Sequence, residues 1–283
     1  MGVFGRLKMG LTLTKDSVLV LRNNPRLAIF PLVSGIAGLL FLVVFLGITF
    51  GLMAVDPEGG VLVGLFLVYL GLTFISTFFT AALVHQTRAV LVGEDPSLGA
   101  GVQAAWDERN LIMIWSLISA TIGVIITAIE NSDSRVARVF ATLFSAAWTL
   151  LTFFIIPTIV FEKTTTKGMF TTSASTFKQT WGETPISLIG VQLISMFVVV
   201  PMLILGYLLA AIHPVVGIGT VLVGVLLGFL VGQSLQGIIK TTLYLYAKEG
   251  TRPAEFDNVD FDRLSESGPD HESPDQRAPA GRV

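Results

Sequence analysis

Residues 27–55 read LAIFPLVSGIAGLLFLVVFLGITFGLMAV, and this run decides the class of fold. It contains no Asp, Glu, Lys, Arg or His. A helix of about 20 apolar residues is long enough to cross the hydrocarbon core of a bilayer. Because a segment inside a bilayer has to satisfy its own backbone hydrogen bonds, we expect this run to be a transmembrane helix.

Five further runs along the chain have the same character. Together they predict six transmembrane helices, at about residues 27–53, 61–84, 111–129, 139–161, 185–212 and 215–239. The alternating segments of about ten residues that a transmembrane barrel needs are not seen. The predicted fold is therefore an all-α polytopic membrane domain over residues 1–248, with three helical hairpins and interfacial helices between them.

The composition supports this class of protein. Hydrophobic residues make up 52% of the chain and charged residues 13%, and the mean hydropathy is +0.75. Soluble globular chains carry about 25% charged residues, so this chain has too few to cover a water-exposed surface. It also has no cysteine, which excludes disulfides, thiolate metal sites and S-acylation.

The basic residues predict the orientation. Of the 18 Lys and Arg residues, 16 lie in the N-terminal stretch, in residues 85–109 and 162–183, and after residue 239. Basic residues that flank transmembrane helices are retained on the cytoplasmic side. We therefore expect a multi-pass protein of the cell membrane with both termini in the cytoplasm.

Two of the connectors predict amphipathic helices. One follows Asp95-Pro96, and the other carries Phe170, Phe177 and Trp181 at helical spacing. Four aromatic residues are candidate anchors at the membrane interface: Trp106, Trp181, Phe170 and Phe177. The alternative is that these stripes pack as core on the ends of the transmembrane helices.

The N-terminal stretch and these two connectors share a pattern. Each ends in a bulky apolar residue (Leu21, Trp106 or Trp181), and a short polar segment and a transmembrane helix follow. This predicts three units of one cytoplasmic helix and one hairpin. The alternative is that any interfacial helix entering a membrane needs such residues. Residues 249–283, with nine acidic and four basic residues among Pro, Ser and Gly, are predicted to be a disordered tail.

No group of residues predicts catalysis. His85 and His213 fall at opposite ends of transmembrane helices, and His271 falls in the tail. No carboxylate lies well inside a predicted transmembrane helix, and no HExxH or phosphate-binding motif is present. We expect no enzyme activity and no catalytic, metal or cofactor site.

Two kinds of residue inside the predicted transmembrane helices carry information. Gln192, Gln233 and Gln236 predict either a path for a neutral substrate or hydrogen bonds between helices. Glycines recur every fourth residue at Gly224, Gly228 and Gly232, with a shorter version at Gly47 and Gly51. Such stripes are typical of close helix packing.

Three segments carry a resemblance: LRNNPRLAIFPL at 21–32, FTAALV at 79–84 and GEDPSL at 93–98. Over about residues 1–250 the chain resembles an uncharacterised prokaryotic family of integral membrane proteins known as a domain of unknown function. The helix-and-hairpin unit is distantly similar to the membrane domain beside some glycerophosphodiester phosphodiesterases. The resemblance implies the fold and supplies no activity, cofactor or site.

Two functions fit these observations. The first is a non-enzymatic membrane scaffold or accessory protein, whose cytoplasmic helices or tail bind lipid or protein partners and no nucleic acid. The alternative is a carrier or flippase for a neutral or lipidic substrate. We expect a cavity at mid-membrane depth in a carrier and a tightly packed bundle in a scaffold.

Overall fold

The computed structural model describes residues 3–162, 164–180, 184–257 and 259. Within them there is no strand, and six helices are long and apolar enough to span a membrane, so the protein is an all-α, multi-pass membrane protein. The elements are α1 (Val3–Asn23), η1 (Pro25–Ala28), α2 (Ile29–Val55), α3 (Pro57–Leu91), α4 (Leu98–Asp107), α5 (Arg109–Glu130), α6 (Arg135–Leu151), α7 (Ile155–Phe161), α8 (Thr166–Gln179), α9 (Thr184–Ala210), α10 (Pro214–Glu249) and η2 (Ala254–Phe256).

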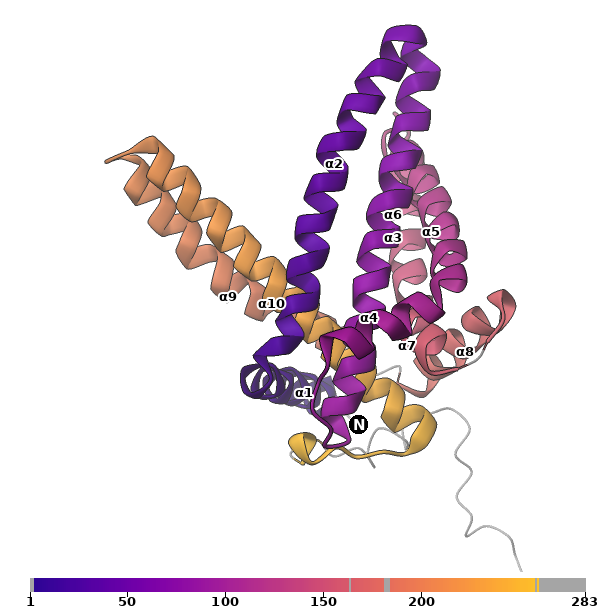
Figure 1. Ribbon diagram of the computed structural model, residues 1–283, viewed down its shortest axis with the longest axis vertical. Coiled ribbons are helices and arrows are strands. Elements are labelled where there is room, and N and C mark those ends of the chain that lie inside the picture. The colour runs from indigo at the N-terminus through magenta and orange to yellow at the C-terminus, as the bar shows by residue number, and fades with distance from the viewer. Residues whose placement is uncertain (1–2, 163, 181–183, 258, 260–283) are drawn as a thin grey trace, which may run out of the picture.

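The membrane helices form three hairpins, which we call the first arm (α2 and α3), the second arm (α5 and α6) and the third arm (α9 and α10). The first two lie together, whereas the third leaves them at a wide angle (Figure 1). The arms are mostly exposed. In the apolar 18-residue stretch of each helix, only 6% of the residues of α9 and 11% of those of α2 are buried. Such surfaces suit contact with lipid.

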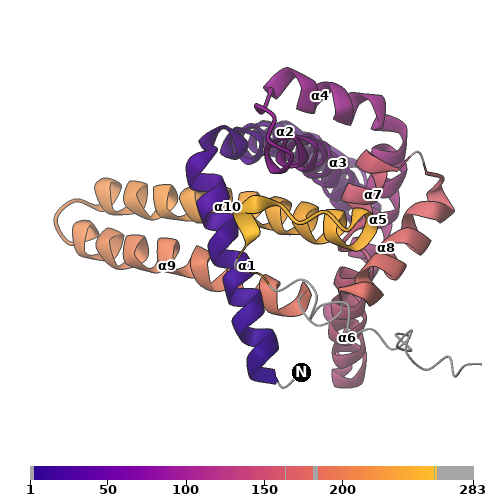
Figure 2. The ribbon, with the colours of Figure 1, turned by 90° about the horizontal axis from the view of Figure 1, so that it is seen from below.

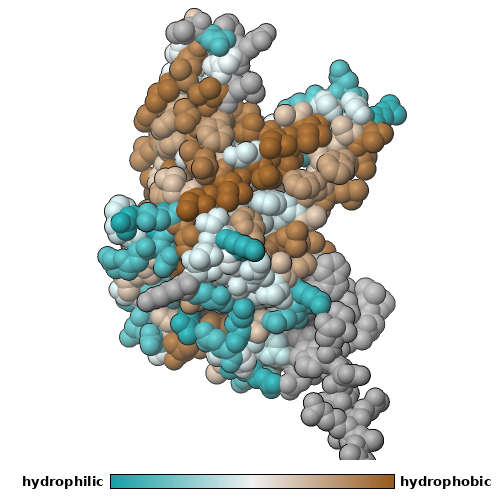
Figure 3. Space-filling view, turned by 90° about the vertical axis from the view of Figure 1, so that its right-hand side faces the viewer, coloured by the Kyte–Doolittle hydropathy of each residue, from teal (hydrophilic) through white to brown (hydrophobic). Residues whose placement is uncertain are grey.

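All three arms extend from one polar base. The base consists of α1, α4, α7, α8, η2 and the last part of α10, from Ser234 to Glu249 (Figure 2). Figure 3 shows apolar arms above a base rich in polar side chains. Leu235, Leu243 and Phe154 are fully buried in the base and belong to its core.

The order of elements repeats three times as an amphipathic helix followed by an arm. Each of these helices packs on a different unit from its own. The α4 helix lies on α3, where Gly101 contacts Ala82 and Gln86 and where the Gln86 side chain accepts a hydrogen bond from Ser97 N. The α8 helix lies mainly on α7 and α6, and α1 lies on α9 and α10, where Thr14 faces Gly190. The three units therefore hold one another in a closed ring.

The helix boundaries differ most from the predicted ones at three places. The α3 and α10 helices continue past the predicted ends at 84 and 239 into the base, where Val90 of α3 and Leu243 of α10 are buried. The fourth transmembrane segment breaks at residues 152–154, since Pro157 lacks the N–H that would bond to Phe153 O. Ser173 compensates there: its Oγ accepts from Phe154 N at 3.2 Å and donates to Leu151 O at 2.6 Å.

The predicted disordered tail begins too early. Gly250 ends α10 with a φ of 64°, and residues 254–256 then form η2 against α1. Phe256 is buried in the core, which accounts for the order of this stretch. Most of the remaining tail, residues 260–283, lies outside the described residues.

Candidate functional site

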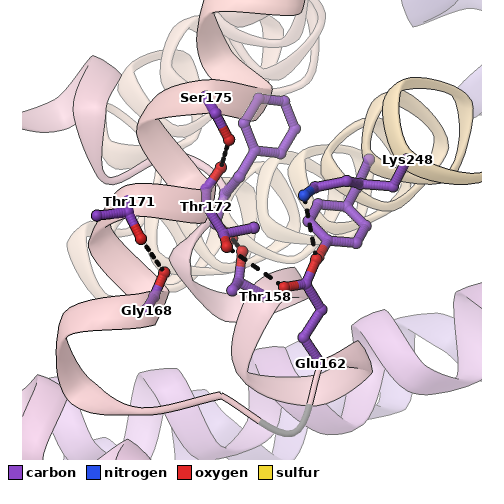
Figure 4. A network of polar contacts seen from close by, with 9 residues as sticks. Thr158, Glu162, Gly168, Thr171, Thr172, Ser175 and Lys248 are labelled. Carbon is purple, nitrogen blue, oxygen red and sulfur yellow. Dashed lines mark hydrogen bonds and ion pairs between the residues drawn. The ribbon is translucent and has the colours of Figure 1, made fainter.

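The strongest polar cluster is in the base around Glu162, which directly follows α7 (Figure 4). Tyr244 donates a hydrogen bond to Glu162 Oε1 at 2.6 Å, and Lys248 Nζ lies 3.3 Å from the same oxygen. Thr172 of α8 donates to Oε2 at 3.3 Å. One carboxylate therefore ties together α7, α8 and α10.

A second ion pair extends this cluster to α3. Arg88 Nη2 lies 3.0 Å from Glu249 Oε1, and the Arg88 guanidinium lies over the Phe161 ring, 5.3 Å from its centre. Both partners of the ion pair are substantially exposed to solvent. An exposed pair of this kind contributes about 0–1 kcal/mol, so it orients the helix ends more than it stabilises them.

The electrostatics of Glu162 suit a structural ion pair. Partial burial acts to raise the pKa of Glu162, but the Tyr244 hydrogen bond and the Lys248 charge outweigh it and hold the pKa below its ordinary value. The carboxylate is thus ionised at neutral pH, and both of its oxygens are engaged. This arrangement joins helices. A general base would need an oxygen free to accept a substrate proton.

Sequence reasoning missed this cluster. Tyr244 and Lys248 are four residues apart on α10, which places them on one helix face. Their partner Glu162 is 82 residues away from Tyr244 and falls in a connector between the predicted transmembrane helices. The i, i+4 spacing was the one available signal.

The two histidines among the described residues lie far apart along the arms. His85 is near the base end of α3, where its Nδ1 lies 3.1 Å from Gln86 Nε2, and His213 precedes α10 at the far end of the third arm. Within the residues that the structure describes, no three His, Asp or Glu side chains are grouped to hold a metal ion.

The structure separates the candidate interface anchors. Trp106 is 55% exposed and packs edge-on against Phe78 of the first arm. Phe177 is only 6% exposed, which favours the alternative that this stripe packs as core. Phe170 is partly buried and packs against Trp115 and Trp148 at the edge of the core. Trp181 lies outside the described residues.

The glycine stripe of α10 faces α9 of the same chain. A Cβ at Gly224 or Gly228 would collide with Met202 or Val199, and one at Gly232 would lie 2.8 Å from Ser195 Oγ. Close packing of this hairpin thus depends on the glycines. By contrast, a Cβ at Gly47 or Gly51 would meet nothing within 4 Å, so this shorter stripe is not a contact between the described helices.

The glutamine side chains within the arms do not pair with each other. Gln192, Gln233 and Gln236 make no side-chain hydrogen bond among the described residues, which argues against the predicted bonds between helices. On α3, four hydroxyl residues share one face at i, i+3, i+4 and i+7, and we call them the hydroxyl row: Thr73, Ser76, Thr77 and Thr80.

Two hollows lie along this row. An open groove of about 360 Å³ is lined by Val68, Tyr69, Leu72, Thr73, Ser76 and Thr77. A smaller cavity of about 10 Å³ begins where the first and third arms part, and its lining includes Ser34, Ser76, Thr80, Phe229 and Gln233. The two hollows share Ser76. The small one has room for about one water molecule, which is far less than an enclosed path for a substrate requires.

Comparison with known proteins gives one match. The model of a family described as being of unknown function (DUF6159) matches residues 59–254, from the start of α3 to the start of η2. No curated protein and no solved structure matches the chain.

Proposed function

The chain belongs to DUF6159, a family of unknown function, and we propose that it is a non-enzymatic scaffold or accessory protein of the cell membrane. The observation that supports this role is the closed ring of the base. Each amphipathic helix is fixed on a different unit, so the three arms are held by one rigid platform. A platform of this kind presents the exposed faces of α4 and α8 in a constant geometry.

The exposed polar surface of the base fits binding of protein partners. Gln103 and Asp107 of α4 are exposed and joined by a hydrogen bond of 2.8 Å, and Ser175 and Lys178 of α8 are exposed as well. Trp106 lies beside them. Its side chain is about half exposed and packs edge-on against Phe78, which suits the boundary between lipid and water. Base and arms thus offer two different surfaces.

Site-specific photocrosslinking in native membranes tests the proposal. A photoreactive residue at Gln103 in the base is expected to give discrete protein adducts, and one at Val139, which is exposed on the second arm, is expected to give lipid adducts. Equal labelling of proteins at both positions, or none at Gln103, would contradict a scaffold that works through its base.

The orientation is part of the same proposal, because the basic residues concentrate at the base. The chain has no cysteine, so a thiol reagent can react only at a cysteine that is introduced singly. An impermeant thiol reagent applied to intact cells should label Asp133→Cys at the tip of the second arm and leave Ser97→Cys in the base unlabelled. The reverse pattern would refute a cytoplasmic base.

A carrier or flippase is the second candidate, favoured by the unpaired hydroxyls between the arms. Purified protein in liposomes distinguishes the two. A scaffold leaves the rate of lipid or solute movement at the level of empty liposomes, whereas saturable movement would replace our proposal with a carrier.

A further inference from the structure

The α1 helix has two opposite faces. Leu13, Ser17 and Val20 are buried against the rest of the base, and the Ser17 hydroxyl donates to Leu13 O at 2.8 Å. On the other side, four exposed residues follow one another at i, i+4, i+8 and i+11, and we call them the outer stripe: Leu11, Lys15, Leu19 and Arg22. Apolar and basic residues alternate along it, so the outer stripe combines two exposed leucines with two positive charges.

The basic residues of the outer stripe are not neutralised by acidic neighbours. Asp16 is the only acidic residue in the sequence of α1, and it lies on the buried face with 1% of its surface exposed. Arg26 of η1 is exposed just beyond the stripe. Among the described residues, no ion pair involves Lys15, Arg22 or Arg26. Three positive charges are therefore available to an anion outside the chain.

The position of α1 places the outer stripe at the boundary of the membrane. Thr14, on the buried face, lies against Gly190, at the start of the membrane-spanning part of α9 (Ile189–Ala210). At its other end, α1 leads directly into the first membrane-spanning segment, which begins at Pro25. Seen from below, the helix crosses both α9 and α10 (Figure 2). Two separate points of α1 are therefore fixed at the level where membrane helices begin.

This depth and this composition together select one kind of partner. The anions present at high density at a membrane boundary are the phosphates of lipid head groups. Lys and Arg side chains can extend to them, while their apolar stems and the neighbouring leucines stay against the acyl chains. An acidic protein in water would give no reason for Leu11 and Leu19, which are 43% and 42% exposed. The alternating pattern therefore fits a lipid surface better than a protein surface.

We propose that the outer stripe, together with Arg26, binds anionic phospholipids of the leaflet next to the base. Lys15, Arg22 and Arg26 contact the lipid phosphates. Leu11 and Leu19 lie among the upper parts of the acyl chains. Because α1 packs on the third arm and leads into the first arm, the bound lipids connect both arms to the membrane surface. This surface does not depend on the scaffold proposal, because it requires only that the arms are embedded in a membrane.

Fluorescence quenching on the purified full-length protein tests this surface. A bimane label on Asn23→Cys, an exposed position beside Arg22, reports lipids that approach the stripe. The protein is titrated in nonionic detergent micelles with brominated phosphatidylglycerol, which is anionic, or with brominated phosphatidylcholine, which is zwitterionic and has the same chains. Phosphatidylglycerol is expected to quench the label at a much lower mole fraction, and added salt should remove this preference. A label on Leu222→Cys should respond equally to both lipids, because neither α9 nor α10 up to Ile239 contains Lys or Arg.

Charge variants show whether the outer stripe carries the preference. Lys15→Gln/Arg22→Gln removes two exposed charges and should raise the phosphatidylglycerol midpoint by about tenfold or more, since each basic residue near an anionic surface contributes roughly a factor of five. Lys15→Arg/Arg22→Lys keeps both charges and should retain the preference. Arg135→Gln/Arg138→Gln is the matched control, because it removes two exposed charges at the tip of the second arm.

Three outcomes would overturn the proposal: equal midpoints for the two lipids in the parent, an unchanged preference in Lys15→Gln/Arg22→Gln, or an equal loss of preference in Arg135→Gln/Arg138→Gln. Loss of the preference in Lys15→Arg/Arg22→Lys as well would assign the effect to packing and also overturn it. These results leave the crosslinking at Gln103 untouched, so the lipid surface and the scaffold role can fail separately.

Discussion

The two halves of α10 lie in opposite surroundings, although they belong to one continuous helix. From Pro214 to about Leu230 the helix packs mainly on α9 along its glycine face, with Phe229 close to Gly35 of α2, and most of its other side chains are exposed. From Ser234 to Leu245 it runs through the core of the base and is buried on nearly all sides. The outer half is suited to contact with lipid, and the inner half is suited to contact with other helices of the protein.

The difference explains the composition of each half. Lipid tails are as apolar as leucine, so the outer half gains little from burying Leu or Val and relies on close glycine contacts. The inner half is covered by other helices and carries Thr241, Thr242 and Tyr244, whose hydroxyls donate to Gly237 O, Ile238 O and Glu162. Stability should therefore be concentrated in the base.

The same substitution in each half gives the largest contrast. Leu243 is fully buried, so Leu243→Ala should lower the free energy of unfolding by about 2–5 kcal/mol through lost contacts and a cavity. Leu222 in the outer half is 64% exposed, and Leu222→Ala should change the free energy of unfolding by less than about 0.5 kcal/mol. Equilibrium unfolding in mixed micelles measures both. Equal effects would mean that the arm is also covered.

A smaller effect is expected where the third arm does pack tightly. Gly228→Leu inserts a side chain into Val199 and should cost about 1–3 kcal/mol. Gly219→Leu is the control in the same helix, because a Cβ there meets nothing within 4 Å. If both variants melt at the parent's temperature, α9 does not lie on the glycine stripe.

The Glu162 cluster makes a pH-dependent contribution of about 1 kcal/mol, a modest value because the carboxylate is partly exposed. Its pKa is lowered on folding, so this stability is present above the unfolded value of about 4.3 and is lost as the pH falls through the folded pKa. Parent and Glu162→Gln should thus differ at pH 7 and converge at pH 3. A constant difference across this range would show that the effect is steric.

The exposed ion pair should give the smallest effect. A double-mutant cycle on Arg88→Ala and Glu249→Ala should yield a coupling of about 0.2–1 kcal/mol that shrinks with added salt. A coupling above about 2 kcal/mol would mean that the pair is shielded from water by something bound to the base.

The sequence allowed the membrane helices and their order to be predicted, because apolar length is a local property. It also located the glycine stripe, whose period lies within one helix. The partners of long-range contacts could not be read in this way. Glu162 and Tyr244 are far apart in sequence, and Phe177 reads as an interface residue until α8 is placed on α7. The hydroxyl row has a visible period on α3, but only the structure shows that its members lack partners.

The closed ring has a consequence for how the chain is made. The α1 helix is synthesised before α9 and α10, yet its buried face lies on them. Because N-terminal segments emerge before their distant partners, α1 has to wait with Leu13 and Val20 uncovered until the third arm is inserted. Phe256 then packs from η2, after α10, onto the same helix. Assembly of the base thus has to follow the synthesis and insertion of the third arm.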